Sequence, residues 1–467
     1  MLLVLLTLCR PGEAAALDTL DVGGPWGSPT TDEPTALWWN PAGIAAGGGH
    51  QLFVEGAPVF ASFHLDRAQP HRGVDEYGLT GVIPYLGLTS DLGVDGLGLG
   101  LGLAAPYVRG AKARGEGGAG SFALQEGSTQ TLHLLFAGAY EYRDLVAVGA
   151  AFHLVDSRWE ATLDNDTMVQ LSDALQAEGE EPGYTDEGLE DPRYATTLDY
   201  DTLHARTHTW ALGLRARPHP RVVIGLSHQR PYRLDHQGEV SLQTSCPPTS
   251  DAPGRLGAEL YGICDSTLRA NAGLAYDMPA RWHMGVAYTP IDPLRVELLG
   301  GFVTWSRFSD YEIQISGTAE KNTFETDKAK EETPALIDQD RLWARDAMDS
   351  WFAGLDLKQE VAGGRVILGG RALYDRAAIP TYALSANNWD ADDLALSALV
   401  AFRPLPQVRI GATFTHHILA ARETTDSEFG MTLDPATRKE DRWFYPHGNG
   451  RYTGGIERIG LSGSLHF

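Results

Sequence analysis

The chain ends at residues 455–467 with GIERIGLSGSLHF, a stretch in which apolar or small residues alternate with polar residues. Leu461 and Leu465 belong to one parity, and Arg458 and Ser462 to the other. A period of two places these sets on opposite faces of a β-strand. The last strand of a soluble sheet fits this pattern, and so does the closing strand of an outer-membrane β-barrel, which leaves no sheet edge. The stretch predicts a strand and leaves both fold classes open.

Composition disfavours a helical membrane protein and a string of soluble domains. The 467 residues include 53 glycines, and no proline- or serine-rich linker divides them. Mean hydropathy is −0.21, and no uninterrupted run of about 18 apolar residues occurs, which a membrane helix needs. The net charge of −24 argues against nucleic-acid binding, because that needs a basic face. A large barrel fits, since it spreads its membrane signal over short alternating segments.

Segments of about ten to fifteen residues, long enough for a tilted strand to cross a bilayer, follow one another after Gly49. Short connections such as 142–143 alternate with long polar ones such as 159–202, as periplasmic turns alternate with external loops. We therefore predict an all-β fold, a transmembrane antiparallel β-barrel of about 14 strands spanning residues 50–467. The candidate strands are 50–64, 78–89, 96–108, 129–141, 144–158, 203–217, 220–234, 270–290, 294–308, 349–360, 364–376, 391–403, 406–420 and 455–467.

One parity of each candidate strand is predicted to face lipid, where a charge at mid-depth would cost roughly 2–4 kcal/mol. An aromatic girdle is expected near the strand ends. The girdle candidates are Trp159, Trp210, Trp305 and Phe402. The lipid-facing candidates include Val146, Val148, Ala150, Phe152, Leu154, Trp282, Met284, Val286, Tyr288, Val408, Ile410, Ala412 and Phe414.

The opposite parity, predicted to face the lumen, is mostly Gly, Ala, Ser and Thr, with isolated charges such as Arg215, Arg371 and Arg409. A lumenal lining of such small, weakly polar side chains suits the passage of an apolar solute or a plug packed against the wall. Alternatively, the glycines only permit strand curvature.

Residues 1–16 are predicted to be a secretory signal peptide. Leu2 to Leu8 form its apolar core, and Ala14 to Ala16 offer a cleavage site of small residues. In an exported protein Cys246 and Cys264 are expected to form a disulfide. A zinc site would need further Cys or His ligands nearby. We predict no metal site and no cofactor.

Residues 17–49 do not alternate, and Thr31 or Asp32 is predicted to cap a short helix. Trp38 and Trp39 follow, and exposing both to water would be costly. A fourteen-stranded barrel is too wide for side chains alone to fill. We therefore expect residues 17–49 to form a plug, or hatch, in the lumen. The alternative is a helix docked on the periplasmic rim.

Four stretches resemble the long-chain fatty-acid/toluene transporter family (FadL-like). The first is Trp38-Trp39-Asn40-Pro41-Ala42-Gly43, and the second is Gly96–Tyr107, which ends in Ala105-Pro106-Tyr107. Residues 278–308 and 376–393 are also similar. The resemblance implies that Trp38 to Gly43 belong to the hatch. It also implies a lateral opening at a kinked third strand around Ala105, Pro106 and Tyr107.

The resemblance implies a passive transporter for hydrophobic compounds, such as long-chain fatty acids or aromatic hydrocarbons, in the bacterial outer membrane. Its expected partners are a hydrophobic small molecule and outer-membrane lipid with lipopolysaccharide. The barrel-assembly machinery is expected to recognise Leu461, Leu465 and Phe467 in the C-terminal strand. The alternative is a structural or secretion-associated barrel. An outer-membrane hydrolase is less favoured because the chain lacks a G-x-S-x-G motif, so no enzyme is expected.

Overall fold

The computed structural model describes residues 22–68, 73–113, 124–166, 195–244, 267–308, 310–316, 339–427, 432–433, 440–441 and 448–467. The predicted signal peptide and both Cys246 and Cys264 lie outside these residues, so these two predictions stay predictions.

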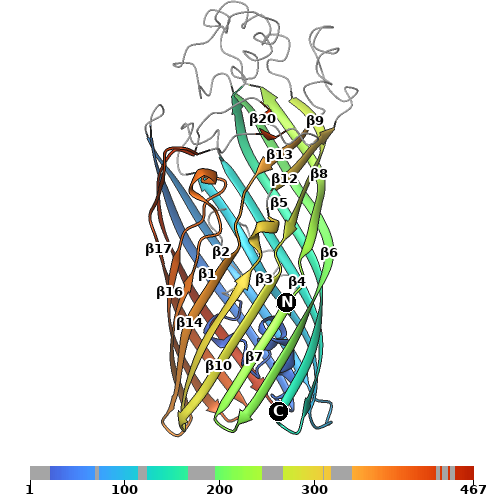
Figure 1. Ribbon diagram of the computed structural model, residues 1–467, viewed down its shortest axis with the longest axis vertical. Helices are drawn as coiled ribbons and strands as arrows, with labels where there is room; N and C mark the ends of the chain where they lie inside the picture. Colours follow the sequence, from blue (N-terminus) through green and yellow to red (C-terminus); the bar gives the residue numbers. More distant parts are fainter. Residues whose placement is uncertain are drawn as a thin grey trace, which may run out of the picture.

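The strands form one antiparallel sheet that closes into a 14-strand barrel, as predicted (Figure 1). Several barrel strands are interrupted and carry two labels, as β7 and β8 do, which both pair with β6. The short connections lie together at one end of the barrel. The strands are β1 His50–Arg67, β2 Val74–Ser90, β3 Leu97–Ala113, β4 Glu126–Tyr142, β5 Val146–Asp166, β6 Ala195–His219, β7 Val222–Gln229, β8 Tyr232–Thr244, β9 Thr267–Met278, β10 Arg281–Ile291, β11 Leu294–Val303, β12 Asp310–Ser316, β13 Gln339–Ala344, β14 Ser350–Val361, β15 Val366–Asp375, β16 Asp393–Leu405, β17 Val408–Leu419, β18 Arg422–Thr424, β19 Thr432–Leu433, β20 Glu440–Asp441 and β21 Gly450–His466.

The C-terminal stretch closes the barrel. β21 pairs with β1 on one side and with β17 on the other. At the end of this seam the amide of Phe467 donates to the carbonyl of His50 at 2.9 Å, and the amide of His50 donates to the carbonyl of Phe467 at 2.8 Å. The strand predicted from residues 455–467 is therefore confirmed as the closing strand, and its edge is paired.

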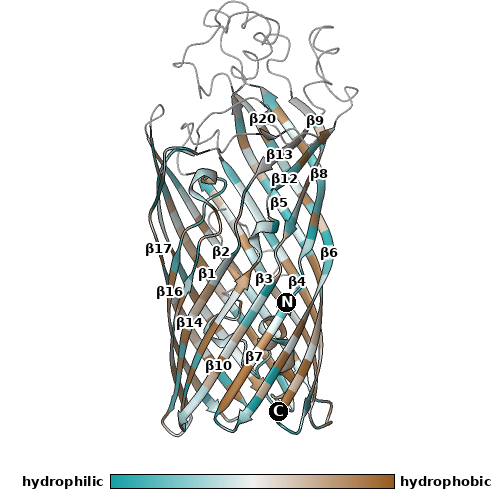
Figure 2. Cartoon of the chain, in the orientation of Figure 1, coloured by the Kyte–Doolittle hydropathy of each residue, from teal (hydrophilic) through white to brown (hydrophobic). Residues whose placement is uncertain are grey.

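The predicted lipid face is confirmed in the half of the barrel next to the short turns. Val148 is 57% exposed, Met284 50% and Ile410 58%, whereas their strand neighbours Ala147, His283 and Arg409 are buried. Figure 2 shows hydrophobic residues frequent in this half and hydrophilic residues frequent toward the opposite end. Apolar side chains point outward here because they meet hydrocarbon rather than water.

The prediction of an aromatic girdle on the outer surface is wrong for two of its members. Phe402 is 51% exposed on the outer surface, but Trp159 and Trp305 are only 3% and 5% exposed and lie in the inner hydrophobic cluster. The parity of apolar residues reverses along the strands. Ile224 and Leu226 of β7 point outward, whereas Tyr232, Leu234 and Val240 of β8 are buried between exposed polar neighbours such as Arg233 and Asp235. The far ends of the strands therefore extend past the apolar belt, with polar residues outside and apolar residues inside.

The N-terminal segment, residues 22–49, lies within the ring of strands near the short turns (Figure 1). It contains η2 Gly24–Trp26, α2 Ala36–Trp39 and η3 Pro41–Ala45. Residues 22–45 are buried apart from the half-buried Asp32 and Glu33. In the described part of the chain no helix is long and apolar enough to span a membrane.

The predicted helix cap is displaced. Thr31 accepts a hydrogen bond from the amide of Glu33 at 3.3 Å, but in a turn before the helix. The helix itself begins at Ala36 after Thr35, whose hydroxyl donates to the carbonyl of Trp26 instead of capping. Packing inside the barrel thus prevails over the local capping signal.

Candidate functional site

Glycines of the wall receive the N-terminal segment at close range. A Cβ on Gly213 would lie 2.1 Å from Oδ1 of Asn40, and one on Gly225 would lie 2.0 Å from the carbonyl oxygen of Pro29. Gly149 faces the backbone of Ala42 in the same way, at 2.5 Å. Because real Cβ atoms do not approach so closely, these positions accept only glycine while the segment is in place. Of the two interpretations of the small lining, the structure supports packing against an inner element.

The six residues predicted for the hatch, Trp38 to Gly43, all lie within this segment and are buried. The Asn40 side chain donates to the carbonyls of Pro29 at 2.8 Å and of Leu214 at 3.0 Å, and accepts from the amide of Ala42 at 3.2 Å. It therefore ties the segment to itself and to β6. Gly43 is also required by space, since a Cβ there would lie 2.1 Å from the carbonyl of Thr31.

The two adjacent tryptophans face different surroundings. The indole N–H of Trp39 donates to the carbonyl of Val22 at 2.9 Å, and its own carbonyl accepts from the hydroxyl of Ser227 at 2.5 Å. The ring of Trp39 lies 4.9 Å from that of His283, centroid to centroid. Trp38 instead packs against His133, with ring centroids 5.4 Å apart.

The three predicted lumenal arginines all contact the N-terminal segment. Arg371 donates to the carbonyls of Gly24, Pro25 and Gly27 at 2.7–3.2 Å, and Asp356 balances its charge at 2.8 Å. Arg215 lies 3.6 Å from Asp32. These side chains come from β15 and β6, so the segment is held from separate parts of the wall.

Arg409 forms the third contact, with both guanidinium nitrogens on the carboxylate of Glu33. Its guanidinium also stacks 3.8 Å from the ring centroid of Trp26. Burial alone would raise the pKa of the Glu33 carboxyl, but the charge and hydrogen bonds of Arg409 outweigh it and hold this pKa below its usual range. Bidentate pairing of this kind is the strongest form of carboxylate recognition.

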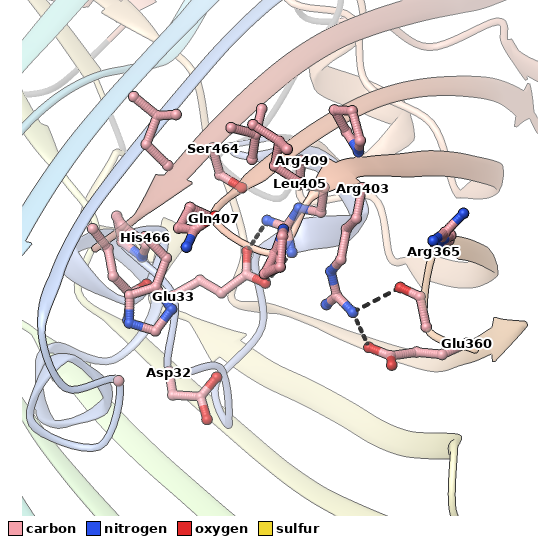
Figure 3. Close-up of a pocket in the computed structure, with 18 of the residues that line it drawn as sticks. Asp32, Glu33, Glu360, Arg365, Arg403, Leu405, Gln407, Arg409, Ser464 and His466 are labelled. Atoms are coloured by element: carbon pink, nitrogen blue, oxygen red, sulfur yellow. Dashed lines mark hydrogen bonds and ion pairs between the residues drawn. The ribbon is translucent and has the colours of Figure 1, made fainter. Parts of the chain in front are cut away.

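A polar cavity of about 740 Å³ opens beside this ion pair (Figure 3). Its lining includes Glu33 from the N-terminal segment, the β14–β15 and β16–β17 turns, and the end of β21. Glu360 pairs with Arg403 at 2.8 Å on the far side of the cavity. The N-terminal segment packs mainly against β3 to β6. The cavity lies on another side of the segment, next to the turns of β14 to β17, where the Glu33–Arg409 pair joins the segment to the wall.

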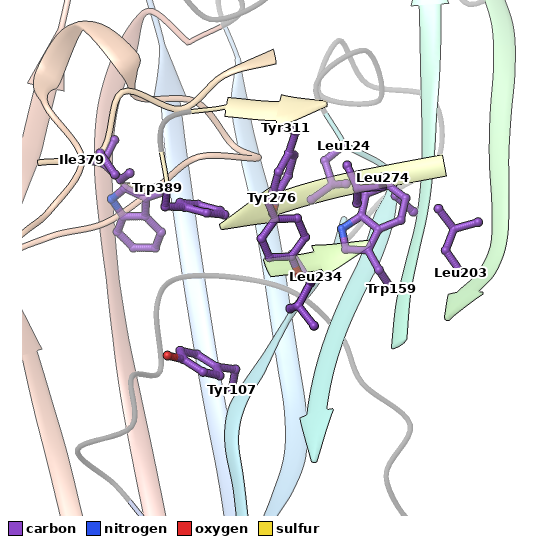
Figure 4. Close-up of a cluster of buried hydrophobic side chains, with 14 of the residues drawn as sticks. Tyr107, Leu124, Trp159, Leu203, Leu234, Leu274, Tyr276, Tyr311, Ile379 and Trp389 are labelled. Atoms are coloured by element: carbon purple, nitrogen blue, oxygen red, sulfur yellow. The ribbon is translucent and has the colours of Figure 1, made fainter. Parts of the chain in front are cut away.

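The half of the barrel away from the short turns is called the external half, because external loops are the longer connections in such barrels. It carries an apolar inner surface that sequence reasoning did not find. Figure 4 shows its aromatic and aliphatic side chains turned toward one another across several strands. The ring of Tyr276 packs against Tyr311 and Phe308 at 4.9 and 5.4 Å. The surface includes Phe63, Leu65, Trp159, Tyr200, Leu203, Tyr232, Leu234, Leu274, Tyr276, Met278, Trp305, Phe308, Tyr311 and Trp389. The sequence signal that could have predicted this surface is the reversed alternation in strands such as β8, where the apolar residues point inward and the polar residues outward.

The connection 376–392 between β15 and β16 contributes to this surface. Ile379, Leu384 and Trp389 are buried in the same cluster, and Trp389 packs edge-on against Phe63 at 4.3 Å. Asp390 holds the loop in shape by accepting from the amide of Ala378 at 2.5 Å. Its three large apolar residues were the signal that this segment folds inward.

Strand β3 departs from a regular wall at the predicted position. It pairs with β2 up to Ala104 and again from Lys112, opposite Tyr85 and Gly78. Between these two points the regular β2–β3 ladder is broken, over residues 79–84 and 105–111, while residues 79–84 stay paired with β1 and residues 107–111 with β4. The ladder to β4 shifts register between Ala104 and Tyr107.

Residues Ala104 to Val108 are buried without alternation, so this part of β3 bends into the lumen. Pro106 lies in the shifted stretch, where its missing N–H costs no ladder bond. The structure thus places Ala105, Pro106 and Tyr107 beside a gap in the regular ladder between β2 and β3.

A polar cluster lies between the apolar surface and the N-terminal segment. Nδ1 of His133 lies 3.2 Å from Nδ1 of His153, and Nε2 of His133 lies 3.2 Å from the hydroxyl of Tyr232. Arg281, 1% exposed, donates to the hydroxyl of Tyr107. Sequence reasoning missed this cluster because its members come from five different strands.

A family model described as outer membrane protein transport protein (OMPP1/FadL/TodX) matches residues 27–430. The chain belongs to this family. It is an outer-membrane protein, and the family is one of transport proteins rather than enzymes. No curated protein matches it in sequence.

Solved structures with the same fold as this family member share little sequence with it. A Pseudomonas aeruginosa FadL homologue is 15% identical with a TM-score of 0.68, covering 98% of this chain and 99% of its own. The Pseudomonas putida toluene transporter TodX is 14% identical with a TM-score of 0.62, covering 93% and 94%. The Ralstonia pickettii toluene transporter TbuX is 15% identical with a TM-score of 0.61, covering 98% and 99%.

The three residues predicted to be recognised by the assembly machinery lie on the outer surface of this family member. Leu461 is 63% exposed, Leu465 39% and Phe467 70%. They share the outward parity of β21 at the end near the short turns. Their recognition by assembly machinery stays a prediction.

Proposed function

We propose that the protein is a passive transporter that carries hydrophobic compounds across the outer membrane. The observation that carries this proposal is the apolar inner surface of the external half, where a general porin would present polar side chains to water. Such a surface gives apolar molecules an affinity that an aqueous pore lacks. Structural neighbours include toluene transporters, which supports the same class of substrate.

In this proposal the N-terminal segment is the hatch. Its contacts with wall glycines and arginines support a closed resting state. A ligand opens the hatch only to the extent that it binds the open arrangement more tightly than the closed one. The polar cavity beside Glu33 and Arg409 offers the segment room to move toward β14–β17.

The gap between β2 and β3 is the proposed lateral exit. An apolar compound leaving there enters hydrocarbon and avoids the polar cavity at the periplasmic mouth. The break in the β2–β3 ladder between Tyr85/Ala104 and Gly78/Lys112 supports this route. Lipid and lipopolysaccharide around the apolar belt, and the assembly machinery at β21, are the proposed macromolecular partners.

An uptake assay tests the proposal. Cells that lack other transporters of this class are supplied with a labelled long-chain fatty acid or toluene, with and without the protein. We expect the protein to accelerate uptake of the apolar compound and to leave uptake of a small sugar unchanged. Equal acceleration of both would indicate a general porin. No acceleration, together with a co-purifying partner protein, would indicate a secretion-associated barrel.

A further inference from the structure

We propose that the outer face of β5, β6 and the break between β7 and β8 binds the phosphate groups of lipopolysaccharide in the outer leaflet of the membrane. The inference rests on the proposed function only for its choice of partner, lipopolysaccharide, to which it gives a defined site. The site consists of Arg158, Arg206 and Arg230, which lie just beyond the apolar belt on this part of the wall.

Three rings on the outer face mark the external edge of the apolar belt. The ring of His228 in β7 lies 4.2 Å from that of Trp282 in β10 and 6.1 Å from that of Trp210 in β6, centroid to centroid. Trp282 is exposed, and Trp210 and His228 are half-buried. Aromatic side chains at the border of a membrane barrel lie at the level of the lipid head groups. The three rings therefore place the outer head-group layer at this height of the wall.

The three arginines project outward at this level and directly beyond it. The amide of Arg230 donates to the carbonyl of Trp210 at 3.0 Å, so Arg230 lies beside the rings. Arg206 lies further along β6, and its side chain is 87% exposed. Arg158 of β5 is exposed as well and pairs in register with His204, the next residue but one to Arg206. Diagonal neighbours of this kind lie about 7–8 Å apart, so Arg158 and Arg206 can reach one phosphate group together.

The charge of this surface differs from that of the whole chain, which is −24. On the outward side of β5 and β6 one carboxylate, Asp156, lies at the level of Arg158 and Arg206, and it is 2.9 Å from Arg206. Farther out the side chains become acidic again, as at Glu160 and Asp201. Water would solvate either sign of charge equally well. A surplus of arginine confined to the head-group level therefore indicates an anionic neighbour at that level.

Elsewhere on the wall the charges beyond the belt are balanced. His64 of β1 lies 3.8 Å from Glu76 of β2. Arg451 of β21 is exposed and stands in register between Asp66 of β1 and Glu423 of β18. An arginine flanked by two carboxylates has little charge to offer a lipid, so Arg451 provides a matched control for the proposed site.

Lipopolysaccharide fits this surface better than a phospholipid does. Its lipid A part carries phosphate monoesters on sugars at the top of several acyl chains, whereas a phospholipid carries one phosphodiester. Guanidinium groups bind phosphate through paired N–H donors. The acyl chains would lie along the exposed Phe152, Leu154 and Leu212 of the belt, which brings the phosphates to the height of the arginines.

The test measures binding of diphosphorylated lipid A to the purified full-length protein in detergent, with dephosphorylated lipid A as the ligand control. Because hydrogen bonds between arginine and phosphate are charge-assisted, we expect the wild type to prefer the phosphorylated form by roughly tenfold or more. Arg158→Gln and Arg206→Gln should each reduce this preference severalfold, and the double variant should abolish most of it. Arg451→Gln removes the same charge elsewhere on the outer face and should leave the preference unchanged.

The substituted side chains are exposed, so all variants should fold, and the heat-dependent mobility of the barrel in detergent gels checks this. Equal affinity for the two forms of lipid A in the wild type would overturn the inference. So would an unchanged preference in the double variant, or an equal loss in Arg451→Gln. Phosphatidylglycerol that binds as tightly as diphosphorylated lipid A would overturn it too, because the surface would then attract any anionic lipid.

These outcomes are independent of transport. If the lipid A preference is absent but the uptake assay shows acceleration, this inference fails and the proposed transport stands. If the preference is present but no apolar compound is taken up, the proposed transport fails and the lipid site stands.

Discussion

Gly213 and Gly225 show at the scale of single residues how the wall accommodates its contents. Each lies at an inward position where a single added carbon would collide with the N-terminal segment. Gly463 lies on the outward parity of β21 and has nothing within 4 Å of an added Cβ. The same residue type thus serves close packing at some positions and is unconstrained at others.

Gly225→Val should displace the N-terminal segment without preventing barrel formation, because valine suits a strand but its side chain overlaps the carbonyl of Pro29. We expect higher single-channel conductance in planar bilayers and faster proteolysis of the segment. Gly463→Val is the control and should behave as the wild type. Wild-type conductance in both variants would contradict the close packing described here.

Glu33→Gln should loosen the segment on its cavity side. The charge-assisted pair with Arg409 contributes about 2 kcal/mol to docking, and its loss should appear as more frequent opening in single-channel recordings. Glu360→Gln is the matched control, since it breaks the Arg403 pair in the same cavity and leaves the segment untouched. Equal opening frequencies in the two variants would rule out a special role for Glu33.

The ion pair also predicts a pH response. The Glu33 pKa is lowered in the folded protein, so the pair is fully present above the ordinary glutamate pKa of about 4.3 and is lost only as pH falls through the lowered value. Opening frequency should therefore be constant from about pH 8 to 5 and rise only in stronger acid. Recordings at stepped pH check this, with Glu33→Gln expected to show no acid rise.

At the scale of elements, β2 and β3 decide whether the wall has an exit. An ideal Cβ on Gly81 of β2 lies 3.8 Å from Cγ1 of Val108 of β3, within the gap in the β2–β3 ladder. A disulfide between Gly81→Cys and Val108→Cys is therefore within reach and would join the two strands. Oxidation should block uptake of an apolar ligand, and a reductant should restore it.

A control disulfide at Phe60→Cys and Thr80→Cys joins β1 to β2 where they already pair. It should leave uptake unchanged in either redox state. Blocked uptake in both pairs would point to a general effect of cross-linking. Continued uptake with the Gly81–Val108 bridge formed would refute exit through this gap.

Pro106→Val gives a second, independent test. Valine restores a backbone N–H and favours a paired strand, so β3 should lean back toward β2 and uptake should slow. The barrel should still fold, because the ladders on either side are intact. Uptake at the wild-type rate would count against the inward bend as a functional feature.

The alternation of apolar and polar residues along a strand explains which of these elements could be predicted from the sequence and which could not. Alternation at Val148, Met284 and Ile410 predicted both strands and faces, because lipid selects apolar residues at every second position. The same rule misplaced Trp159 and Trp305, since beyond the apolar belt the outside is wet and the inside becomes the apolar face. Clusters such as His133 with Tyr232 join residues 99 positions apart, and no local pattern reveals such a contact.

For the whole molecule, the N-terminal segment decides whether the barrel is closed. Fourteen strands enclose a bore that side chains cannot fill, and the segment occupies it next to the short turns. Deleting residues 17–49 while keeping the signal should leave a folded barrel that conducts ions continuously in planar bilayers. Conductance as low as that of the intact protein would show that other elements close the bore.

The seam between β1 and β21 bears on how the molecule is made. His50 and Phe467 exchange two hydrogen bonds, so the ring becomes complete only after the chain has been synthesised and exported as far as Phe467. Until then the growing sheet has two open margins, which invite pairing with other chains, and contacts between such remote partners form slowly. A truncated product would keep these margins permanently and so present a ready mark for degradation by the quality-control proteases of the cell envelope.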